Sequence, residues 1–294
     1  MGLDLLCVGA ANLDVVVSVD RAPRPDERVV AREIVHAGGG PAATAAVAAA
    51  RLGVSVGFCG RVGADAEGDL ILDSLTSEGV DIAHVTRDRE VPSGASVIIV
   101  DRTEAGRQIC ARTAPPPERI PDVEGWLHVD QVGYEALTRE HRRNSLISFD
   151  HGNPVPSLDL NGIDLYVPSR PMVSTLWPGD LGAAVQDMRS QGADRVVVTD
   201  GAAGAWHSVD GRLHQTPGHR VPGPLSTLGA GDVFHGALVA GVIQGRPLAE
   251  AVERANACAA LACQGLDGRS AIPTGPQLDE FLGRLSDQTP TTTT

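Results

Sequence analysis

Short apolar segments alternate with helical patterns along most of the chain, and this alternation limits the fold more than any other feature. Strands are predicted at residues 3–8, 54–59, 126–129, 146–150 and 195–199. Helices are predicted from Pro41 to a stop at Gly53, and at residues 68–78, 134–142, 181–191, 233–244 and 248–264. Strands separated by helices form a parallel sheet that is covered on both faces. The sequence therefore predicts an α/β fold with three layers, α/β/α, around a mainly parallel central sheet.

Two segments depart from this alternation. An apolar strand is predicted at residues 15–19, after a Gly-Ala turn with Asp14 at the junction, and the chain to about Val35 is charged and extended. The segment "GASVIIVDRTEAGRQICAR", residues 94–112, reads as a hairpin with its turn at residues 104–106. We expect residues 15–35 and 94–112 to form a small separate sheet within one domain of residues 1–285. Residues 286–294, ending in "TPTTTT", are expected to form a disordered tail.

Charge and composition exclude several classes of function. The formal net charge is −13, so nucleic acid and anionic membranes are not expected as partners. The chain contains no lysine, which excludes Walker A NTPases, protein kinases and Schiff-base enzymes. The histidines show no zinc-site spacing, and no metal ligands are predicted. The five cysteines form no CxxC pair, and neither a signal peptide nor an apolar run of roughly 20 residues is present. We expect a cytoplasmic protein.

The stretch "STLGAGDVFHGA" has the composition of an anion-binding site. Gly229 and Gly231 let successive backbone N–H groups converge, and the helix that follows adds the positive end of its dipole. Asp232 stands beside these groups, where it could accept the proton of an attacking hydroxyl. A second interpretation is that Asp232 only stabilises the start of the helix through the dipole.

This stretch also resembles the second signature of the PfkB, or ribokinase-like, carbohydrate kinases. "AGGGPAATAAVAAARLG" resembles the first signature, "GRVGADAEGDLILDSLTSEGVDI" the segment after it, and "VVVTDGAAGAW" the turn on the nucleotide side. The matches follow the family order from about Leu3 to Pro273, and the two signatures are most similar to those of sulfofructose kinases. The resemblance implies a ribokinase-like fold whose small sheet is a lid over the sugar. It also implies ATP as a cofactor. We expect Mg²⁺ as well, because no lysine can neutralise the β- and γ-phosphates, and a homodimer joined through the lid, because an open sheet of two to four strands leaves edges that need covering.

The resemblance assigns roles to particular residues. It makes Asp232 the base that deprotonates the acceptor hydroxyl, with Gly229, Ala230 and Gly231 as the anion hole. The sugar site would contain Asp14, Gly38, Gly39, Gly40 and Thr44, which stands where asparagine is often found. The nucleotide would lie beside Thr199, Gly201, Gly204, Thr227, Ala255, Asn256 and Ala259.

Several positions differ from the family pattern. Ser226 replaces the usual aspartate of the second signature, and Ser169 and Met172 stand where an asparagine and a glutamate normally help to hold magnesium. Compensation could come from the segment "FDHGNP", through Asp150, His151 and Asn153, and from a contact of Arg170 with phosphate.

The substrate remains open at this level. Arg28, Arg107 and Arg112 are the candidates to bind an anionic group on the sugar, although we favour the interpretation that all three belong to a solvated lid surface. The positions expected to bind sulfonate fall near Ala111 and Gly133, which leaves a neutral ketose or another sugar acid as alternatives to sulfofructose. A nucleoside kinase of the same fold and a non-catalytic sugar- or nucleotide-binding relative are the other hypotheses.

Overall fold

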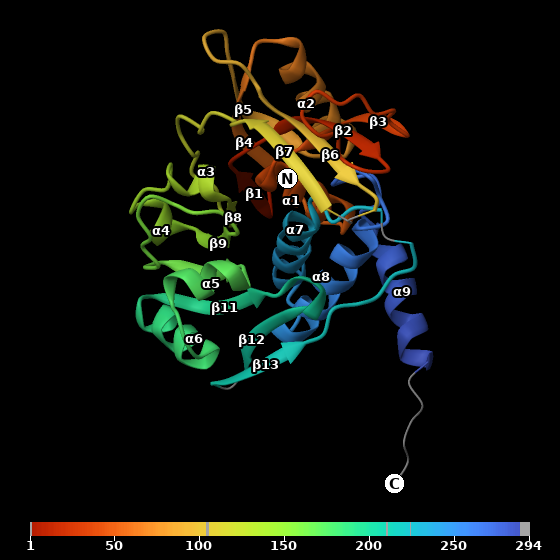
Figure 1. Cartoon of the computed structure of the whole chain (residues 1–294). Coiled ribbons are helices and arrows are strands. Elements are labelled where there is room, and N and C mark those ends of the chain that lie inside the picture. Colours follow the sequence, from red (N-terminus) through yellow and green to blue (C-terminus); the bar gives the residue numbers. More distant parts are fainter. Residues whose placement is uncertain (1, 104–105, 210, 224, 289–294) are drawn as a thin grey trace.

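A twisted sheet forms the centre of the molecule (Figure 1). The computed structural model describes residues 2–103, 106–209, 211–223 and 225–288. Within these ranges the central sheet has nine strands in the order β13-β12-β11-β10-β9-β8-β1-β4-β5. The strands are β1 (Leu5–Val8), β4 (Val56–Gly63), β5 (Asp81–Asp88), β8 (Trp126–Val129), β9 (Leu146–His151), β10 (Ile163–Pro168), β11 (Ala193–Thr199), β12 (Ala205–Val209) and β13 (Arg212–Thr216). Neighbours are parallel except β11–β12 and β12–β13, which confirms the α/β class and the mainly parallel sheet.

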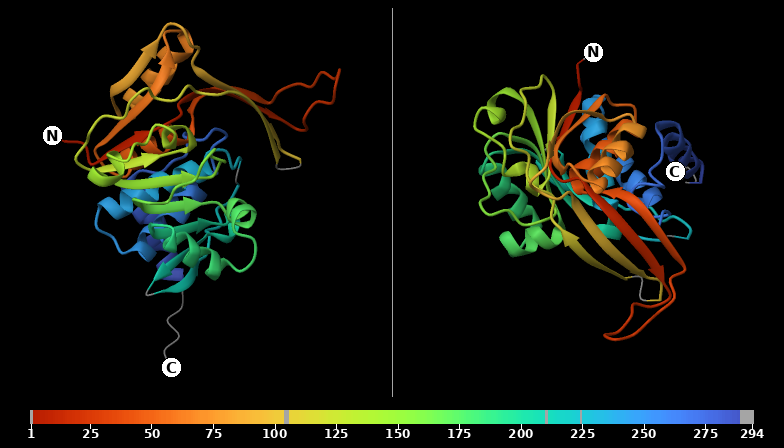
Figure 2. Two further views of the ribbon diagram at one scale, coloured as in Figure 1. Left: turned by 90° about the vertical axis from the view of Figure 1, so that its left-hand side faces the viewer. Right: turned by 90° about the horizontal axis from the view of Figure 1, so that it is seen from above.

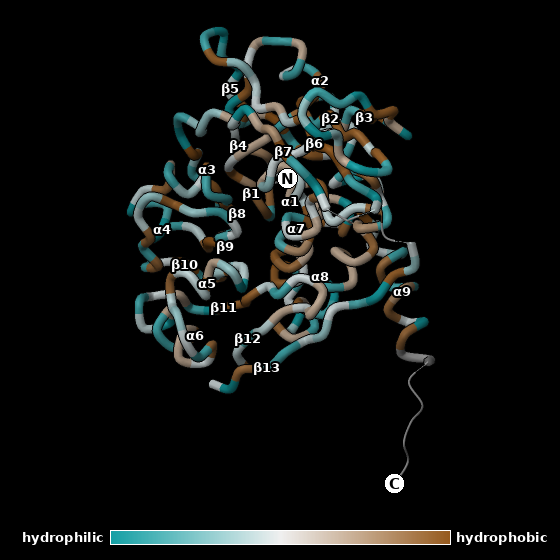
Figure 3. Tube along the Cα trace, viewed as in Figure 1, coloured by the Kyte–Doolittle hydropathy of each residue, from teal (hydrophilic) through white to brown (hydrophobic). Residues whose placement is uncertain are grey.

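Helices cover both faces of this sheet, as Figures 1 and 2 show. One face carries α1 (Pro41–Arg51), α2 (Ala66–Ser77), α7 (Ala230–Ile243), α8 (Leu248–Ala262) and α9 (Gly275–Gln288). The other carries α3 (Gln131–Tyr134), α4 (His141–Asn144), α5 (Arg170–Leu176) and α6 (Leu181–Ser190). The middle strands are apolar on both faces because both are packed against helices (Figure 3). The predicted three-layer arrangement is therefore confirmed.

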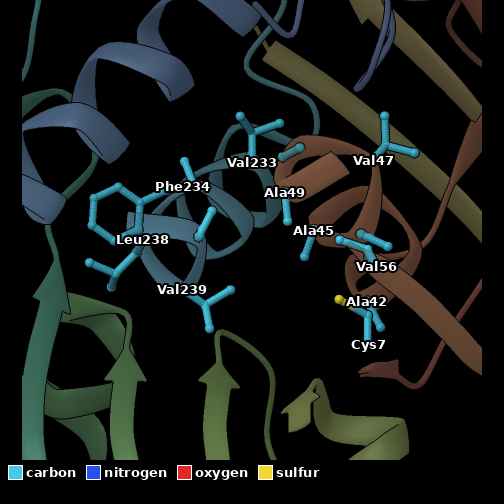
Figure 4. Close-up of a cluster of buried hydrophobic side chains, with 14 of the residues drawn as sticks. Cys7, Ala42, Ala45, Val47, Ala49, Val56, Val233, Phe234, Leu238 and Val239 are labelled. Atoms are coloured by element: carbon cyan, nitrogen blue, oxygen red, sulfur yellow. The ribbon is translucent and has the colours of Figure 1, made fainter. Parts of the chain in front are cut away.

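Small residues let α1 and α7 approach each other closely (Figure 4). A Cβ atom on Gly236 would overlap the backbone of Ala45, so this position of α7 accepts only glycine. Val233 and Leu238 complete the contact from α7, and both are fully buried. This packing fixes the first turn of α7, where Asp232 lies, against the helix that follows the glycine-rich segment.

The small sheet consists of β3 (Glu33–Gly39), β2 (Asn12–Val19), β6 (Gly94–Asp101) and β7 (Gly106–Arg112), in that spatial order. The outer pairs are antiparallel and the central β2–β6 pair is parallel. Figure 2 shows these strands projecting from the body of the molecule. The lid strands lie where the sequence predicts them, but Asp14 lies inside β2 rather than at a junction. Gly38 and Gly39 form the end of β3 rather than a turn.

The structure corrects other predictions. The helix predicted at residues 134–142 is wrong: α3 and α4 are separate, because the Thr138 hydroxyl accepts the His141 N–H (3.3 Å) and begins a new turn there. Strands β5, β10, β12 and β13 and helices α5 and α9 were not predicted. Helix α9 continues to Gln288, so residues 286–288 are helical and not part of a tail. Residues 104–105 of the predicted hairpin turn, and residues 289–294 of the predicted tail, lie outside the described residues.

Two further features bear on the environment of the protein. None of the described helices is both long and apolar enough to cross a membrane. The five cysteines are all free, and only Cys110, on β7, is exposed.

Candidate active site

The first turn of α7 presents unused backbone donors. Gly229 precedes the helix with a φ of 71°, in the left-handed region, and a Cβ there would lie 2.8 Å from the Cα of Gly268. The Ala230 N–H donates to the carbonyl of Thr227 (3.3 Å), whereas the N–H groups of Gly231 and Asp232 have no acceptor among the described residues. Gly231 is exposed, with no atom near the place its Cβ would take. These donors and the helix dipole form a site for an anion. Helix α7 begins at Ala230, three residues before the predicted start.

Asp232 lies beside these donors in an acidic environment. Burial raises the pKa of its carboxyl well above the ordinary value, and the negative charges of Asp150, Asp130 and Asp14 raise it further, while Arg269 lowers it. The side chain is nevertheless partly exposed, so a ligand can reach it. A carboxylate with a raised pKa is a stronger proton acceptor, which suits a general base.

Asp14 extends from β2 toward the same region. Its side chain is 7% exposed, and its Oδ1 atom has no hydrogen-bond partner within the described chain; the same holds for Oδ1 of Asn12. Gly39 must lack a side chain, because a Cβ there would overlap the Asp14 carboxylate. Burial raises the pKa of Asp14, although the Ser96 hydroxyl and Arg269 act in the opposite direction. Buried oxygens without partners are suited to accept hydrogen bonds from sugar hydroxyls.

The remaining predicted sugar-site residues are divided between this site and the lid. Gly40 immediately precedes α1 with a φ of 89° and is held close to the carbonyl of Ala10. Thr44 is 2% exposed, and its hydroxyl oxygen accepts a hydrogen bond from Arg269 Nε (3.1 Å), so this oxygen already has a partner within the protein. Arg28 is exposed in the loop between β2 and β3. Arg112 donates to the carbonyl of Ser93 (2.8 Å) at the base of the lid.

Arg269 is a central residue that the sequence does not reveal. It lies in the loop between α8 and α9 and is only 6% exposed. Its guanidinium donates to the carbonyl of Gly39 (2.7 Å), the hydroxyl of Thr44 and, more weakly, the hydroxyl of Ser74 (3.4 Å). A Cβ on Gly38 would overlap this guanidinium, which explains why position 38 is a glycine, like position 39. No periodicity or spacing marks the segment "LDGRSA" as part of a site, because its position depends on the folding of distant segments.

The predicted nucleotide-side residues gather at the ends of β11 and α8. Gly204 follows the 3₁₀ turn Gly201–Ala203 with a φ of 95°, and a Cβ there would overlap the carbonyl of Thr216. The Asn256 amide donates to the carbonyls of Thr216 (3.0 Å) and Pro217 (3.2 Å), so this side chain holds the segment after β13.

The other predicted nucleotide-side residues differ in their exposure to solvent. Thr199 and Ala259 are partly exposed, whereas Ala255 is fully buried and can only support the site from behind. Thr227 is exposed, and its hydroxyl accepts a bond from Arg107 Nη1 (2.7 Å), which joins the lid to the loop before α7.

The positions that differ from the family pattern have local roles. Ser169 caps α5, its hydroxyl accepting the Met172 N–H (3.4 Å), and the Ser226 hydroxyl accepts the Leu228 N–H (3.1 Å).

Asp150 lies at the end of β9, where its carboxylate accepts the Gly152 N–H (2.8 Å) and contacts His235 Nε2 (3.1 Å). Burial first, and then the charge of Asp130, raise the pKa of Asp150 to about 7.

The described residues contain no group of three His, Cys, Asp or Glu side chains arranged to hold a metal. Mg²⁺ normally uses one or two carboxylates together with the phosphates of the substrate. The mutual repulsion of Asp150 and Asp232 is the kind of excess negative charge that a divalent cation relieves, so these residues fit such an ion.

Comparison with known proteins agrees with this geometry. A family model described as "pfkB family carbohydrate kinase" matches residues 3–116 and 173–275. The chain is 25% identical to ribokinase of Bacillus subtilis, over 95% of this chain and 99% of that protein. It is 28% identical to fructokinase of Vibrio alginolyticus, over 84% and 92%. A crystal structure of a putative ribokinase from Agrobacterium tumefaciens is similar with a TM-score of 0.86 and 27% identity, covering 98% of this chain and all of that one.

Proposed function

Because the chain belongs to the pfkB family of carbohydrate kinases, we propose that it transfers the γ-phosphoryl group of ATP to a hydroxyl of a small sugar, with Asp232 as the general base. It is a phosphotransferase with an alcohol group as acceptor. ATP as the donor, a small sugar as the acceptor and Asp232 as the base are the parts that we propose. One observation carries it: the partly exposed Asp232 carboxylate lies beside the free N–H groups that begin α7.

The chemistry follows from these positions. Asp14 and Asn12 accept hydrogen bonds from the sugar, and Asp232 takes the proton of the hydroxyl that attacks the γ-phosphorus. The N–H groups of Gly231 and Asp232 stabilise negative charge on the transferred phosphoryl oxygens. The lid keeps water away from the phosphoryl group, and the contact between Arg107 and Thr227 holds it against the loop before α7.

Mg²⁺ is part of the proposal. It would be bound together with the nucleotide and would neutralise phosphate charge, a role that no lysine in this chain can take. Asp150 and Asp232 are the residues that would face it, directly or through water.

We infer a neutral sugar as the acceptor. On the inner face of the lid, Asp14 is in register with Ser96, and Ser96 with Ala111, so this part of the sugar site offers a carboxylate, a hydroxyl and a methyl group. Gly133 has no side chain, and its N–H is bound to Asp130 (2.8 Å). Neither Ala111 nor Gly133 can bind a sulfonate through its side chain, which favours a ketose or an aldopentose over sulfofructose or a sugar acid.

The other hypotheses have less support. A nucleoside kinase is disfavoured because β2, β3, β6 and β7 contain no phenylalanine, tyrosine or tryptophan on which a base could stack. A non-catalytic relative is disfavoured because the N–H groups of α7 and the Asp232 carboxylate are all in place.

The test is the Asp232→Asn variant, with ADP release measured against neutral sugars, sugar acids, sulfofructose and nucleosides. Asparagine preserves the shape and tolerates a helix start, so kcat should fall at least about a hundredfold while ATP affinity changes little. Asp180→Asn, at the start of the remote helix α6, is the matched control and should keep its turnover. If Asp232 only favours the helix dipole, turnover will persist and stability alone will fall, by roughly 0.3–1 kcal/mol. Failure of the unmodified protein to release ADP with any of these compounds would favour the non-catalytic alternative.

We also propose a cytoplasmic homodimer. A cytoplasmic location supplies ATP and keeps the five free cysteines reduced. The dimer rests on the outer face of the lid, where Val15, Val17, Ile34, Val97 and Ile99 share one side of the sheet by register. Val97 is 49% exposed and Ile34 60%. Covering this face with a second copy would bury these side chains and protect the sheet edges.

A further inference from the structure

His235 is a buried histidine in the apolar part of α7. It follows Asp232 by three residues, is 4% exposed, and has buried apolar neighbours at Phe234 and Leu238. A polar ring in such a place costs free energy unless it forms a hydrogen bond. Its one polar contact within the described residues joins Nε2 to Oδ1 of Asp150 (3.1 Å), because the buried Nδ1 atom has no partner there.

The two oxygens of the Asp150 carboxylate have different surroundings. Oδ1 accepts the Gly152 N–H (2.8 Å) and faces His235 Nε2. Oδ2 accepts no hydrogen bond within the described chain, and it is not one of the fully buried atoms without a partner, so a ligand can reach it. Because an ionised carboxylate oxygen can only accept, the imidazole hydrogen lies on Nε2. One oxygen of this carboxylate is therefore held, and the other is open.

The surroundings of the His235 ring fix its position. His128, a fully buried residue of β8, lies beside it with the ring centroids 5.9 Å apart, and Phe234 meets it edge-on at 6.0 Å. The Nδ1 atom of His128 is in turn at 3.1 Å from the hydroxyl of Ser148 on β9. Rings enclosed in a close-packed interior have little freedom to turn, so the Nε2 donor stays where Asp150 needs it.

We infer that His235 is a positioning residue, which fixes the orientation of the Asp150 carboxylate and leaves Oδ2 free for Mg²⁺ or for water bound to it. The inference rests on the proposed function, since Mg²⁺ belongs to that reaction. Residues three apart lie on one side of a helix, so α7 places the base Asp232 and the donor to Asp150 one turn from each other. The competing explanation is that the contact only satisfies a buried polar ring.

The test measures Mg²⁺ binding without turnover. The unfolding temperature is recorded with saturating ATP and no sugar while the free Mg²⁺ concentration is raised. In His235→Leu, which removes the donor, the Mg²⁺ concentration that gives half of the rise should increase at least about tenfold, since losing a partner that orients a metal ligand typically costs about 10- to 100-fold in metal affinity. His235→Gln should remain near the unmodified protein, because its amide nitrogen can take the place of Nε2.

His141→Leu is the matched control. His141 is also buried, at 7% exposed, and its Nε2 contacts the carbonyl of Ile120 (3.2 Å), but it lies just before the amino end of β9, away from the carboxyl end that carries Asp150. This substitution can lower the unfolding temperature itself, but the Mg²⁺ concentration for half of the rise should not change.

Two results would overturn the inference: an unchanged Mg²⁺ concentration in His235→Leu, or an equal increase in His235→Leu and His235→Gln. If His235→Leu does not fold, by circular dichroism, His235→Asn decides. Its shorter amide reaches only the position of Nδ1, so it should show the increase expected for leucine, and a value like that of glutamine would contradict the role of the Nε2 donor.

The same titration separates this inference from the proposed function. If Asp232→Asn keeps its turnover, the assignment of the base fails, while the Mg²⁺ titration still decides the role of His235. If Mg²⁺ does not raise the unfolding temperature of the unmodified protein with ATP, the proposed cation fails and the inference fails with it. If Mg²⁺ does raise it and His235→Leu titrates identically, only the role of His235 fails.

Discussion

At the scale of single residues, the glycines at the end of β3 are explained by what lies against them. Gly39 does not adopt a left-handed conformation, so its requirement comes only from the Asp14 carboxylate beside it. We predict that Gly39→Ala displaces Asp14 and raises the sugar KM at least about tenfold, since one lost hydrogen bond to a charged group costs roughly 1.5–3 kcal/mol. ATP affinity should be unchanged, as measured by calorimetry. Gly106→Ala is the control, because Gly106 on β7 has open space around it. Unaltered sugar kinetics in Gly39→Ala would contradict this account.

The residues of the site differ in how far the sequence reveals them. Asp232 and Gly229 could be predicted because they belong to one short segment whose local geometry, a left-handed glycine before a helix, depends on neighbouring residues. Arg269 could not, because its contacts lie 195 to 230 residues away in the chain. The same holds for His235, which contacts Asp150 across the core and looks like an ordinary residue of an apolar helix.

At the scale of elements, the lid exposes apolar side chains and sheet edges that a partner could cover. We predict that the unmodified protein is a dimer in light scattering at micromolar concentration, and that Val97→Asp makes it a monomer, because a buried unpaired charge on the outer face of β6 opposes association. Leu176→Asp is the control: Leu176, at the end of α5, is 45% exposed, close to the value for Val97, and α5 packs against β11 of the central sheet. A monomeric unmodified protein, or equal effects of the two substitutions, would argue against pairing through the lid.

The predicted elements were right where their patterns were strong and local. The strand at Trp126–Val129 and the helix at Leu248–Ala262 are buried, apolar and regular, so their patterns identify them. The hairpin of β12 and β13 was missed because much of it is exposed and polar, as an edge of the sheet can be. The helix predicted at residues 134–142 failed because Asp130 and Thr138 each begin a separate turn there, and such side-chain bonds depend on local detail.

At the scale of the whole molecule, the net charge is the reason to expect a divalent cation. If the chain binds ATP as we propose, a protein of net charge −13 without lysine holds a polyphosphate at a site that already contains several carboxylates. We predict that excess chelator abolishes ADP release and that added Mg²⁺ restores it, whereas chelator saturated beforehand with Mg²⁺ has no effect. Full turnover in metal-free chelator would show that backbone donors and arginines are sufficient.

The buried carboxylate of Asp130 links the segment between residues 116 and 173 to the rest of the molecule. The family match is interrupted between residues 116 and 173, as if that stretch were dispensable. Asp130 lies within it, fully buried, and accepts backbone N–H groups from Ala10 (2.8 Å) and Ala42 (3.2 Å), as well as from the start of α3. The stretch also supplies β8, β9 and β10, the middle of the sheet. The stretch outside the family match thus supplies the middle of the sheet, and exchanging it between relatives would require its contacts with the two flanking segments to be exchanged as well.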